Sequence, residues 1–288
     1  MAAPTLYEQI QQFYDASSLL WEQIWGEHMH HGYYGPNGTY KRERRQAQIA
    51  LIEELLTWAE VEHPQTILDV GCGIGGSTLH LAAKYNARAT GITLSPVQAT
   101  RGQERAEIMD LDLRVQFEVA NALEMPFDDD SFDLVWSLES GEHMPDKEKF
   151  IRECYRVLKP GGKLIIATWC HRPTHSVAGE LTPAEQQHLE EIYRVYCLPY
   201  VLSLPEYEAI AQACGLKNLR SADWSEAVAP FWDIVIDSAL NPEAVVGLLR
   251  SGWETIEAAL SLNLMSRGYE TGLVRFGLLC GTKTPERE

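Results

Sequence analysis

The feature that most constrains the fold is a glycine cluster placed directly after a short apolar run. Residues 66–70 (TILDV) have the composition of a buried strand, and Gly71, Gly73 and Gly76 follow them. This G-x-G-x-x-G spacing between a strand and a helix is typical of loops whose backbone approaches a nucleotide-like ligand. The chain is therefore expected to fold as an α/β protein with a ligand site at this loop.

The residues around the loop indicate what kind of ligand it binds. Asp69 places a carboxylate beside the glycines, which suits a ligand with a positive amino group better than a pyrophosphate. NAD-binding proteins have an acidic residue roughly 20 residues further on, whereas residues 91–95 here read GITLS. A dinucleotide site and a tight turn without a ligand stay as the less favoured alternatives.

Strand-like and helix-like segments alternate along the chain up to residue 170. The strand-like segments are 66–70, 88–93, 114–120, 132–137 and 163–169, and the helix-like segments are 45–60, 77–85, 95–109 and 147–158. Such alternation predicts a doubly wound, mostly parallel sheet with helices on both faces. Further along, helical segments at 183–196, 206–214 and 227–269 are interspersed with strands at 216–223 and 273–282, which makes seven strands.

The net charge limits the kinds of partner. Asp and Glu total 41 against 24 Lys and Arg, a formal charge of −17. Neither a nucleic-acid backbone nor an anionic membrane is therefore an expected electrostatic partner, while a peripheral apolar contact with a membrane stays open. The six cysteines include no C-x-x-C pair, and the sequence shows no signal peptide, transit peptide or apolar run of ~20 residues. We expect a reduced protein, cytoplasmic or peripheral to a membrane.

Three motifs in the expected order resemble class I S-adenosylmethionine-dependent methyltransferases, namely 69–76 (DVGCGIGG), 121–123 (NAL) and 158–162 (LKPGG). The resemblance implies S-adenosylmethionine as cofactor, S-adenosylhomocysteine as product, and a Rossmann-like fold with an N-terminal helical lid and a C-terminal helical insertion. The acid that usually ends the second strand is replaced by residues 93–98 (TLSPVQ). The implied cofactor contacts are Tyr14, His31, Asp69, Gly71, Cys72, Gly73, Thr93, Leu94, Gln98, Asn121, Ala122, Leu123 and Ser137.

Four longer segments resemble γ-tocopherol methyltransferases, from about Leu6 to Thr282. They are 13–15 with 25–34, 133–146, 168–172 and 222–232. The likeness is greatest to the cyanobacterial members, because no plastid transit peptide is seen, and it places the protein in the cytoplasm or at the thylakoid membrane. It implies methylation of a chromanol ring ortho to its hydroxyl, giving α-tocopherol from γ-tocopherol and β-tocopherol from δ-tocopherol. Some alkaloid N-methyltransferases are similar in these segments, so N-methylation of an indole alkaloid or other amine is the alternative. A non-catalytic S-adenosylmethionine-binding protein is a third.

The resemblance divides one continuous structural domain into three parts. These are a lid at 1–45, an S-adenosylmethionine-binding core at 46–170, and the rest of the sheet with a helical acceptor-binding insertion at 171–288. An apolar stripe between residues 224 and 265 is expected to be helical core, a groove for the prenyl tail of a lipophilic phenol, or both. The implied acceptor contacts are Trp25, Glu139, Trp169, His171, Trp224, Phe231 and Trp232.

Methylation of an aromatic carbon needs a base, because a phenol becomes nucleophilic at its ortho carbon once it is deprotonated. The loop after the fourth strand offers Glu139, Glu142 and His143 at the carboxyl edge of the sheet, where ligands bind in such folds. We expect the base to be either His143 or Glu142. The alternative is that His143 only orients the loop, and for Glu139 a contact that holds the loop or the lid is favoured.

Three histidines near the N-terminus raise the question of a metal site. His28, His30 and His31 have H-x-H-H spacing, but fitting carboxylate and cysteine partners are absent from their surroundings in the sequence. We therefore expect a lid over the methionine moiety and the acceptor, with no metal. Tyr14 and Tyr34 either bond the carboxylate of the cofactor from this lid or belong to the core.

Overall fold

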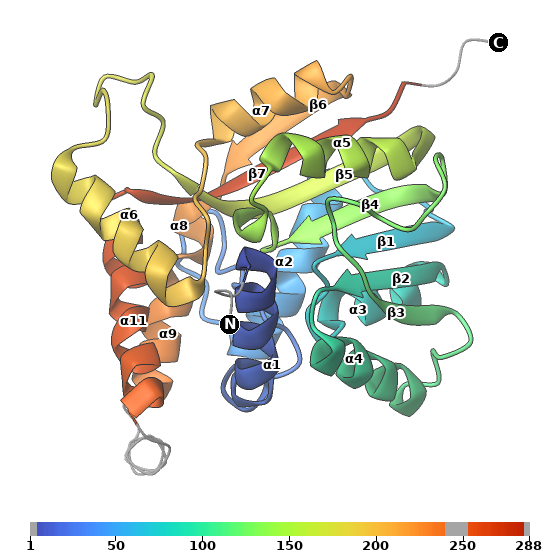
Figure 1. The fold of residues 1–288 in the computed structure, drawn as a ribbon, viewed down its shortest axis with the longest axis horizontal. Helices are drawn as coiled ribbons and strands as arrows, with labels where there is room; N and C mark the ends of the chain where they lie inside the picture. Colours follow the sequence, from blue (N-terminus) through green and yellow to red (C-terminus); the bar gives the residue numbers. More distant parts are fainter. Residues whose placement is uncertain (1–4, 240–252, 285–288) are drawn as a thin grey trace.

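The computed structural model describes residues 5–239 and 253–284. Within them, one seven-stranded sheet runs through the centre of the molecule in the order β3-β2-β1-β4-β5-β7-β6 (Figure 1). The strands β1 to β5 pair in parallel, and β7 runs antiparallel to both β5 and β6. The strands are β1 Thr66–Val70, β2 Arg88–Thr93, β3 Val115–Val119, β4 Phe132–Leu138, β5 Leu158–His171, β6 Lys217–Asp223 and β7 Val274–Thr282. The prediction of a doubly wound, mostly parallel sheet of seven strands is confirmed.

Alternate residues of the central strands contribute to two different apolar clusters. Ile67 and Trp136 belong to one cluster, and Leu68 and Val135 belong to the other, because successive side chains of a strand point to opposite faces. The first cluster includes residues of α2 and α3, and the second includes residues of α5 and α7. Helices thus bury both faces, as parallel sheets require. The helices are α2 Arg44–Trp58, α3 Gly76–Tyr85, α4 Pro96–Ile108, α5 Lys147–Val157 and α7 Leu204–Ala213.

The start of α4 follows directly from its sequence. The Ser95 hydroxyl accepts a hydrogen bond from the Gln98 backbone N–H at 3.1 Å, which satisfies one of the free donors at a helix start. Pro96 occupies the first helical position, where its missing N–H leaves no hydrogen bond unmade. This cap places Gln98 next to the carboxyl end of β2.

The N-terminal segment packs against α4. Helix α1 (Leu6–Trp25) begins with a capping box at Thr5, and Figure 1 shows it beside α4. The Asp15 carboxylate accepts a hydrogen bond from the Ser95 hydroxyl. The guanidinium of Arg101 donates to both carboxylate oxygens of Glu22, at 2.8–3.1 Å. Residues 26–34 then continue from α1 toward α2.

The remaining helices of the described residues gather near the end of the sheet where β5 ends and β7 begins, at the left of Figure 1. They are α6 Pro183–Tyr196, α8 Ser225–Val228, α9 Pro230–Ala239 and α11 Trp253–Glu270. Phe231, Trp232 and Met265 are fully buried among them. None of the helices in the described parts of the chain is both long and apolar enough to cross a membrane.

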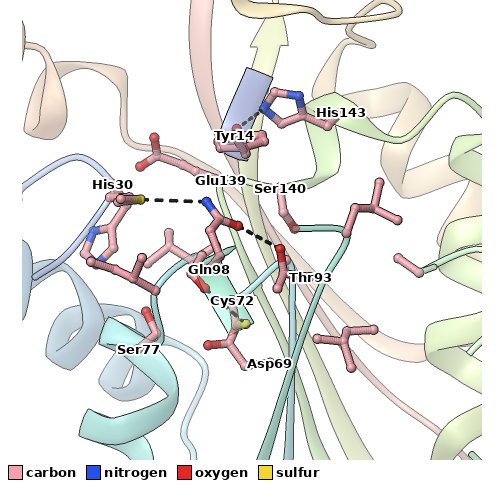
Figure 2. Close-up of a pocket in the computed structure, with 18 of the residues that line it drawn as sticks. Tyr14, His30, Asp69, Cys72, Ser77, Thr93, Gln98, Glu139, Ser140 and His143 are labelled. Carbon is pink, nitrogen blue, oxygen red and sulfur yellow. Dashed lines mark hydrogen bonds between the residues drawn. The ribbon is translucent and has the colours of Figure 1, made fainter. Parts of the chain in front are cut away.

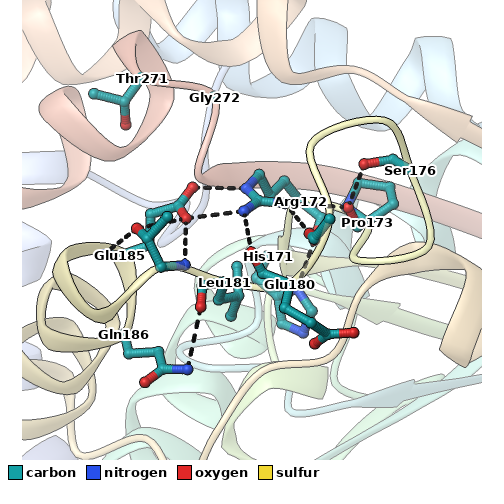
Figure 3. Close-up of polar contacts among 12 residues, drawn as sticks. His171, Arg172, Pro173, Ser176, Glu180, Leu181, Glu185, Gln186, Thr271 and Gly272 are labelled. Atoms are coloured by element: carbon teal, nitrogen blue, oxygen red, sulfur yellow. Dashed lines mark hydrogen bonds and ion pairs between the residues drawn. The ribbon is translucent and has the colours of Figure 1, made fainter.

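One arginine organises the loop between β5 and α6 (Figure 3). The Arg172 guanidinium donates to both carboxylate oxygens of Glu185, at 2.6 and 2.9 Å. It also donates to the carbonyl oxygens of Gly179 and Glu180, at 2.8 and 3.0 Å. A charged fork with several acceptors fixes a loop that has little apolar surface of its own. The loop therefore holds the N-terminal end of α6 against the end of β5.

Candidate active site

A cavity opens at the carboxyl edge of the sheet, between the ends of β1, β2 and β4 and the N-terminal segment (Figure 2). The glycine loop, the end of β2, residues 120–122, residues 138–140 and residues 143–145 form its floor and sides. Tyr7, Ile10 and Tyr14 of α1 complete the lining together with residues 27–30. In open α/β sheets this edge is the usual place for a ligand. The cavity therefore lies where the glycine loop predicts it.

The glycine loop is shaped by close backbone contacts. Gly71 has a φ of +79°, and a Cβ atom there would lie 2.2 Å from the Cβ of Ser140. The backbone N–H groups of Gly71 and Cys72 both donate to the carbonyl oxygen of Ile92. Any side chain at position 71 would push the loop after β4 away from β1. Glycine is therefore required by space as well as by backbone conformation.

Asp69 brings a buried carboxylate to this loop. Its Oδ2 accepts a hydrogen bond from the Thr78 hydroxyl at 2.6 Å, and the residue is 2% exposed. Burial raises the pKa of Asp69 to about 7, although the bond from Thr78 opposes this. A cationic group in the cavity would favour the ionised carboxylate. Asp69 thus fits a ligand that carries an ammonium group.

The end of β2 offers polar atoms in place of an acidic residue. The Thr93 hydroxyl donates to Gln98 Oε1 at 2.7 Å, and Gln98 Nε2 lies 4.0 Å from the sulfur of Met29. Leu94 and residues 121–122 line the cavity nearby. This set can hold a ribose through Thr93 and Gln98 and an adenine ring between apolar and amide groups. It fits S-adenosylmethionine, whose nucleoside carries both parts.

Tyr14 and His143 meet at the cavity from two distant parts of the chain. The Tyr14 hydroxyl and His143 Nε2 are 2.7 Å apart, and both residues line the cavity (Figure 2). Burial and the charge of Lys147 lower the pKa of His143 to about 3. Burial also raises the pKa of Tyr14, as do the charges of Glu142 and Glu139. At neutral pH the pair is therefore an uncharged imidazole beside a protonated phenol.

Glu142 lies next to His143 in the chain but faces another way. Its Oε2 accepts a hydrogen bond from the Thr168 hydroxyl of β5 at 2.7 Å, and it does not belong to the cavity lining. Burial, followed by the charge of Glu139, raises the pKa of Glu142 to about 7. Of the two residues considered for the base, only His143 lines the cavity, whereas only Glu142 has a pKa near neutrality.

Glu139 connects the loop after β4 with the N-terminal segment. Its carboxylate accepts hydrogen bonds from the His31 backbone N–H at 2.6 Å and from Trp169 Nε1 at 3.1 Å, and His31 Nδ1 lies 2.8 Å from it. The charge of His31 and the hydrogen bonds that His31 makes hold the pKa of Glu139 below its usual value despite burial. Glu139 has a φ of +53°, which is uncommon for a residue with a side chain. The arrangement matches the expected contact between the loop and the N-terminal segment.

Many of the residues implied by the sequence meet in this cavity. Those on its lining are Tyr14, Asp69, Gly71, Cys72, Gly73, Thr93, Leu94, Gln98, Asn121, Ala122, Glu139 and His143. Leu123 packs in the apolar cluster beneath, and the Ser137 hydroxyl pairs with that of Ser140 at 2.8 Å. His31 is buried among aromatic rings, 5.0 Å from the ring of Phe231. These three residues therefore support the cavity from behind its lining.

The implied acceptor contacts lie mostly in the core. Trp169, Phe231 and Trp232 belong to one buried apolar cluster, and Trp224 packs at 5.2 Å from the ring of Tyr33. His171 Nδ1 lies 2.7 Å from the carbonyl oxygen of Arg172, away from the cavity. The side chain of Trp25 is outside the described part of the structure, as are those of Trp253 and Leu260 in the apolar stripe. Trp169 of β5 and Phe231 and Trp232 of α9 are therefore packed in the apolar core.

The structure adds lining residues that the sequence reading did not include. Tyr7 and Ile10 of α1 lie on the cavity with Tyr14, and their spacing of three and four residues places them on one helical face. That periodicity is visible in the sequence and could have been used. Ser140 and Met144 line the cavity as well. In the part of the chain that the structure describes, no cluster of three His, Cys, Asp or Glu side chains is arranged to hold a metal ion.

Comparison with solved structures agrees with this fold. A structure of a candidate sarcosine dimethylglycine methyltransferase from Galdieria sulphuraria superposes with a TM-score of 0.78 at 26% identity, covering 94% of this chain and 99% of that one. The geranyl diphosphate C-methyltransferase of Streptomyces coelicolor, solved with S-adenosyl-L-homocysteine, gives a TM-score of 0.76 at 22% identity over 98% and 99% of the two chains. The second likeness concerns the fold alone.

Comparison of sequences identifies the family. A model described as a methyltransferase domain matches residues 68–166. The probable tocopherol O-methyltransferase of rice is 50% identical over 96% of this chain and 78% of its own length. The 2-methyl-6-phytyl-1,4-hydroquinone methyltransferase of Synechocystis is 34% identical (89% and 81%). The norajmaline N-methyltransferase of Rauvolfia serpentina is also 34% identical (93% and 95%). The chain belongs to the tocopherol O-methyltransferase family of S-adenosylmethionine-dependent methyltransferases.

Proposed function

We propose that the protein is a C-methyltransferase that methylates the chromanol ring of γ-tocopherol and δ-tocopherol ortho to the phenol. The observation that carries this proposal is the 50% identity to the rice relative over nearly the whole chain. The cavity supports it, because groups able to hold the cofactor and groups able to take a proton face the same space. The products would be α-tocopherol and β-tocopherol.

The lining residues divide into groups for the parts of the cofactor. Asp69 would bind the methionine ammonium group, and the backbone of the glycine loop would allow its close approach. Thr93 and Gln98 would bond the ribose, with Asn121 and Ala122 beside the adenine. When bound, S-adenosylmethionine supplies an electrophilic methyl group. The chain orients the acceptor toward that group and excludes water.

The proton of the acceptor phenol requires a base at the cavity. His143 can take it through Tyr14, whose hydroxyl lies 2.7 Å from Nε2. Glu142 stays the second proposal, because its pKa of about 7 is better matched to this task. As the phenol loses its proton, electron density moves to the ortho carbon, which would take the methyl group as the bond from that methyl to sulfur breaks, with S-adenosylhomocysteine as the other product. The hydrogen on that carbon then leaves to solvent as a proton, and the oxygen regains the proton held by the base, which restores the aromatic phenol.

The position of the new methyl group is part of the proposal, since the rice relative is named an O-methyltransferase. A second candidate function is N-methylation of an amine, which the 34% identity to the Rauvolfia enzyme favours. A third, binding of the cofactor without catalysis, is the least supported, because the glycine loop and the proton-accepting groups are both intact.

A tocopherol acceptor resides in lipid, so we also propose a peripheral contact with a membrane.

The test is incubation of the protein with methyl-labelled S-adenosylmethionine and, separately, γ-tocopherol, δ-tocopherol and an indole-alkaloid amine. We expect label in both tocopherols, and NMR of the products should show a ring methyl with a free phenol. A methyl ether would establish O-methylation instead. Label in the amine alone would overturn the proposal in favour of N-methylation, and no label in any acceptor would favour the non-catalytic alternative.

A further inference from the structure

A lysine ammonium group is buried beside the loop that carries His143. Lys147 begins α5 and is 1% exposed. Its Nζ donates to the carbonyl oxygen of Glu142 at 2.8 Å and to that of Met144 at 2.6 Å. These two residues directly precede and follow His143 in the chain. One ammonium group thus forms hydrogen bonds with the backbone on both sides of the proposed base.

A buried cation in this place costs free energy, so its presence points to a functional role. Removing an ammonium group from water costs several kcal/mol even after relaxation, and an apolar side chain of similar size avoids this cost. Burial accordingly lowers the pKa of Lys147 to about 7. Lys147 also lies over the ring of Tyr200, with Nζ 4.7 Å from its centre. The ion pairs among the described residues do not include Lys147, so the two carbonyl oxygens are its main polar partners.

The backbone that Lys147 holds is a short turn with two hydrogen bonds of its own, one of them from the His143 N–H to the Ser140 carbonyl oxygen at 3.1 Å. Residues Gly141–His143 form a single 3-10 turn, and the hydrogen bond that closes it, from the Met144 N–H to the Gly141 carbonyl oxygen, is 3.3 Å long. Short turns of this kind have poor hydrogen-bond geometry. The direction of the His143 side chain depends on these peptide groups, and an error of about 1 Å in such a place can cost about 100-fold in rate.

We infer that Lys147 is a positioning residue that aims the His143 ring at Tyr14 by fixing the peptide groups on either side of it. This inference rests on the proposed function, because it takes the base to lie in this loop. Lys147 itself stays away from the cavity lining. It acts on the acceptor only through the residues that it holds.

The electrostatic part of this role has a definite sign. The charge of Lys147 lowers the pKa of His143 and also that of Glu142. Removing the charge therefore raises the pKa of either base, and the acid limb of the pH–rate profile moves to higher pH. Other titratable groups from several elements also face this loop and its partners. They are Glu139 of the same loop, Cys170 of β5, Cys197 after α6 and Tyr207 of α7.

The test replaces Lys147 by Met, which keeps the length of the side chain and removes the charge. In Lys147→Met we expect turnover at pH 7 to fall about 10- to 100-fold, the acid limb to rise by about one to two pH units, and the affinity for S-adenosylmethionine to stay near that of the wild type. The control is Lys163→Met, since Lys163 Nζ also donates to two backbone carbonyl oxygens, those of Ala59 and Glu60, far from the cavity. It should leave turnover and the acid limb unchanged.

A second variant and a second measurement keep the inference open to refutation. Lys147→Arg retains the charge, so it should keep the acid limb of the wild type while lowering turnover, because a planar fork cannot reproduce the ammonium contacts. NMR titration of the His143 ring, identified by comparison with His143→Gln, should show a higher midpoint in Lys147→Met without any acceptor present. The inference is wrong if neither that midpoint nor the acid limb moves. A wild-type protein that methylates neither tocopherol overturns the proposed function alone.

Discussion

At the scale of single residues, Asp69 is a carboxyl group whose charge depends on what shares the cavity with it. Its pKa of about 7 lies well above the ordinary value of 3.8. Without a cation nearby, the folded protein therefore favours the protonated carboxyl group at any pH below about 7. Ionisation of this group then lowers the stability of the unliganded protein progressively as the pH rises from about 4 through 7. A ligand with an ammonium group reverses that preference.

We therefore predict that binding of S-adenosylmethionine strengthens as the pH rises from 6 to 8 and releases a proton. Calorimetry in two buffers with different ionisation enthalpies measures both effects. Asp69→Asn should weaken binding about 10- to 100-fold at pH 8, the range for a hydrogen bond to a charged group, and should abolish the pH dependence. Asp133→Asn is the matched control, because Asp133 bonds Thr66 at the start of β1, at the opposite edge of the sheet. Identical pH profiles for wild type and Asp69→Asn would contradict the assignment.

The two proposed bases make different predictions. If His143 takes the phenol proton, His143→Ala should lower turnover about 10²- to 10⁴-fold with cofactor affinity nearly unchanged. Tyr14→Phe should also lower turnover. If Glu142 takes it, Glu142→Gln should show the larger loss. Single-turnover kinetics measures the chemical step in each variant, and His63→Ala, on the exposed loop before β1, is the control. Normal turnover in both His143→Ala and Glu142→Gln would exclude this loop as the source of the base.

At the scale of elements, α1 closes one side of the cavity and is attached to α4 by the Arg101–Glu22 fork. We predict that Arg101→Met increases the dissociation rate of the cofactor about threefold, as expected for loss of a partly exposed ion pair. Hydrogen exchange should rise in α1 at the same time. Arg152→Met removes a more exposed pair with Glu148 within α5, away from the cavity, and should change neither quantity. Equal dissociation rates in both variants would show that α1 does not limit release.

The elements themselves were largely predictable, because local signals and burial agree. The strands β1 and β2 begin and end where the apolar runs do, and the cap at Ser95 begins α4 as expected. The strand β3 differs, since alternation in residues 114–120 indicates one buried face, yet Val119 is 55% exposed. This strand lies at the edge of the sheet, and position in a sheet depends on contacts between distant segments that a local pattern does not contain.

The same distinction explains what was predictable in the site. The glycine loop and the end of β2 are contiguous motifs, and each of them reaches the cavity. The orientation of Glu142 away from the cavity could not be predicted, because it depends on the Thr168 hydroxyl of β5. The pairing of Tyr14 with His143 spans 129 positions. The residues of the loop after β4 are thus candidates for the base from the sequence alone. Which of them faces the cavity depends on how β4 and its loop pack against β5.

At the scale of the whole molecule, the aromatic C-terminal region is part of the main core. Trp232 is fully buried and lies in the same apolar cluster as Ile67 of β1 and Leu51 of α2. We predict that Trp232→Ala lowers the free energy of unfolding by about 3–5 kcal/mol, as judged by urea denaturation. Tyr40→Ala, at an exposed aromatic residue, should change it little. A small effect at Trp232 would instead favour a groove that only a lipid tail fills.

The loop that Arg172 holds offers a place to attach a reporter. The guanidinium supplies hydrogen bonds that fix residues 179 and 180, and the Ser176 hydroxyl bonds the Pro173 carbonyl oxygen, so the loop keeps its shape without the side chain at its tip, where Val177 is fully exposed. A fluorophore on a cysteine introduced there would sit between β5 and α6, the helix that Cys197 follows. Labelling would first require replacing Cys197 and Cys214, which are partly exposed.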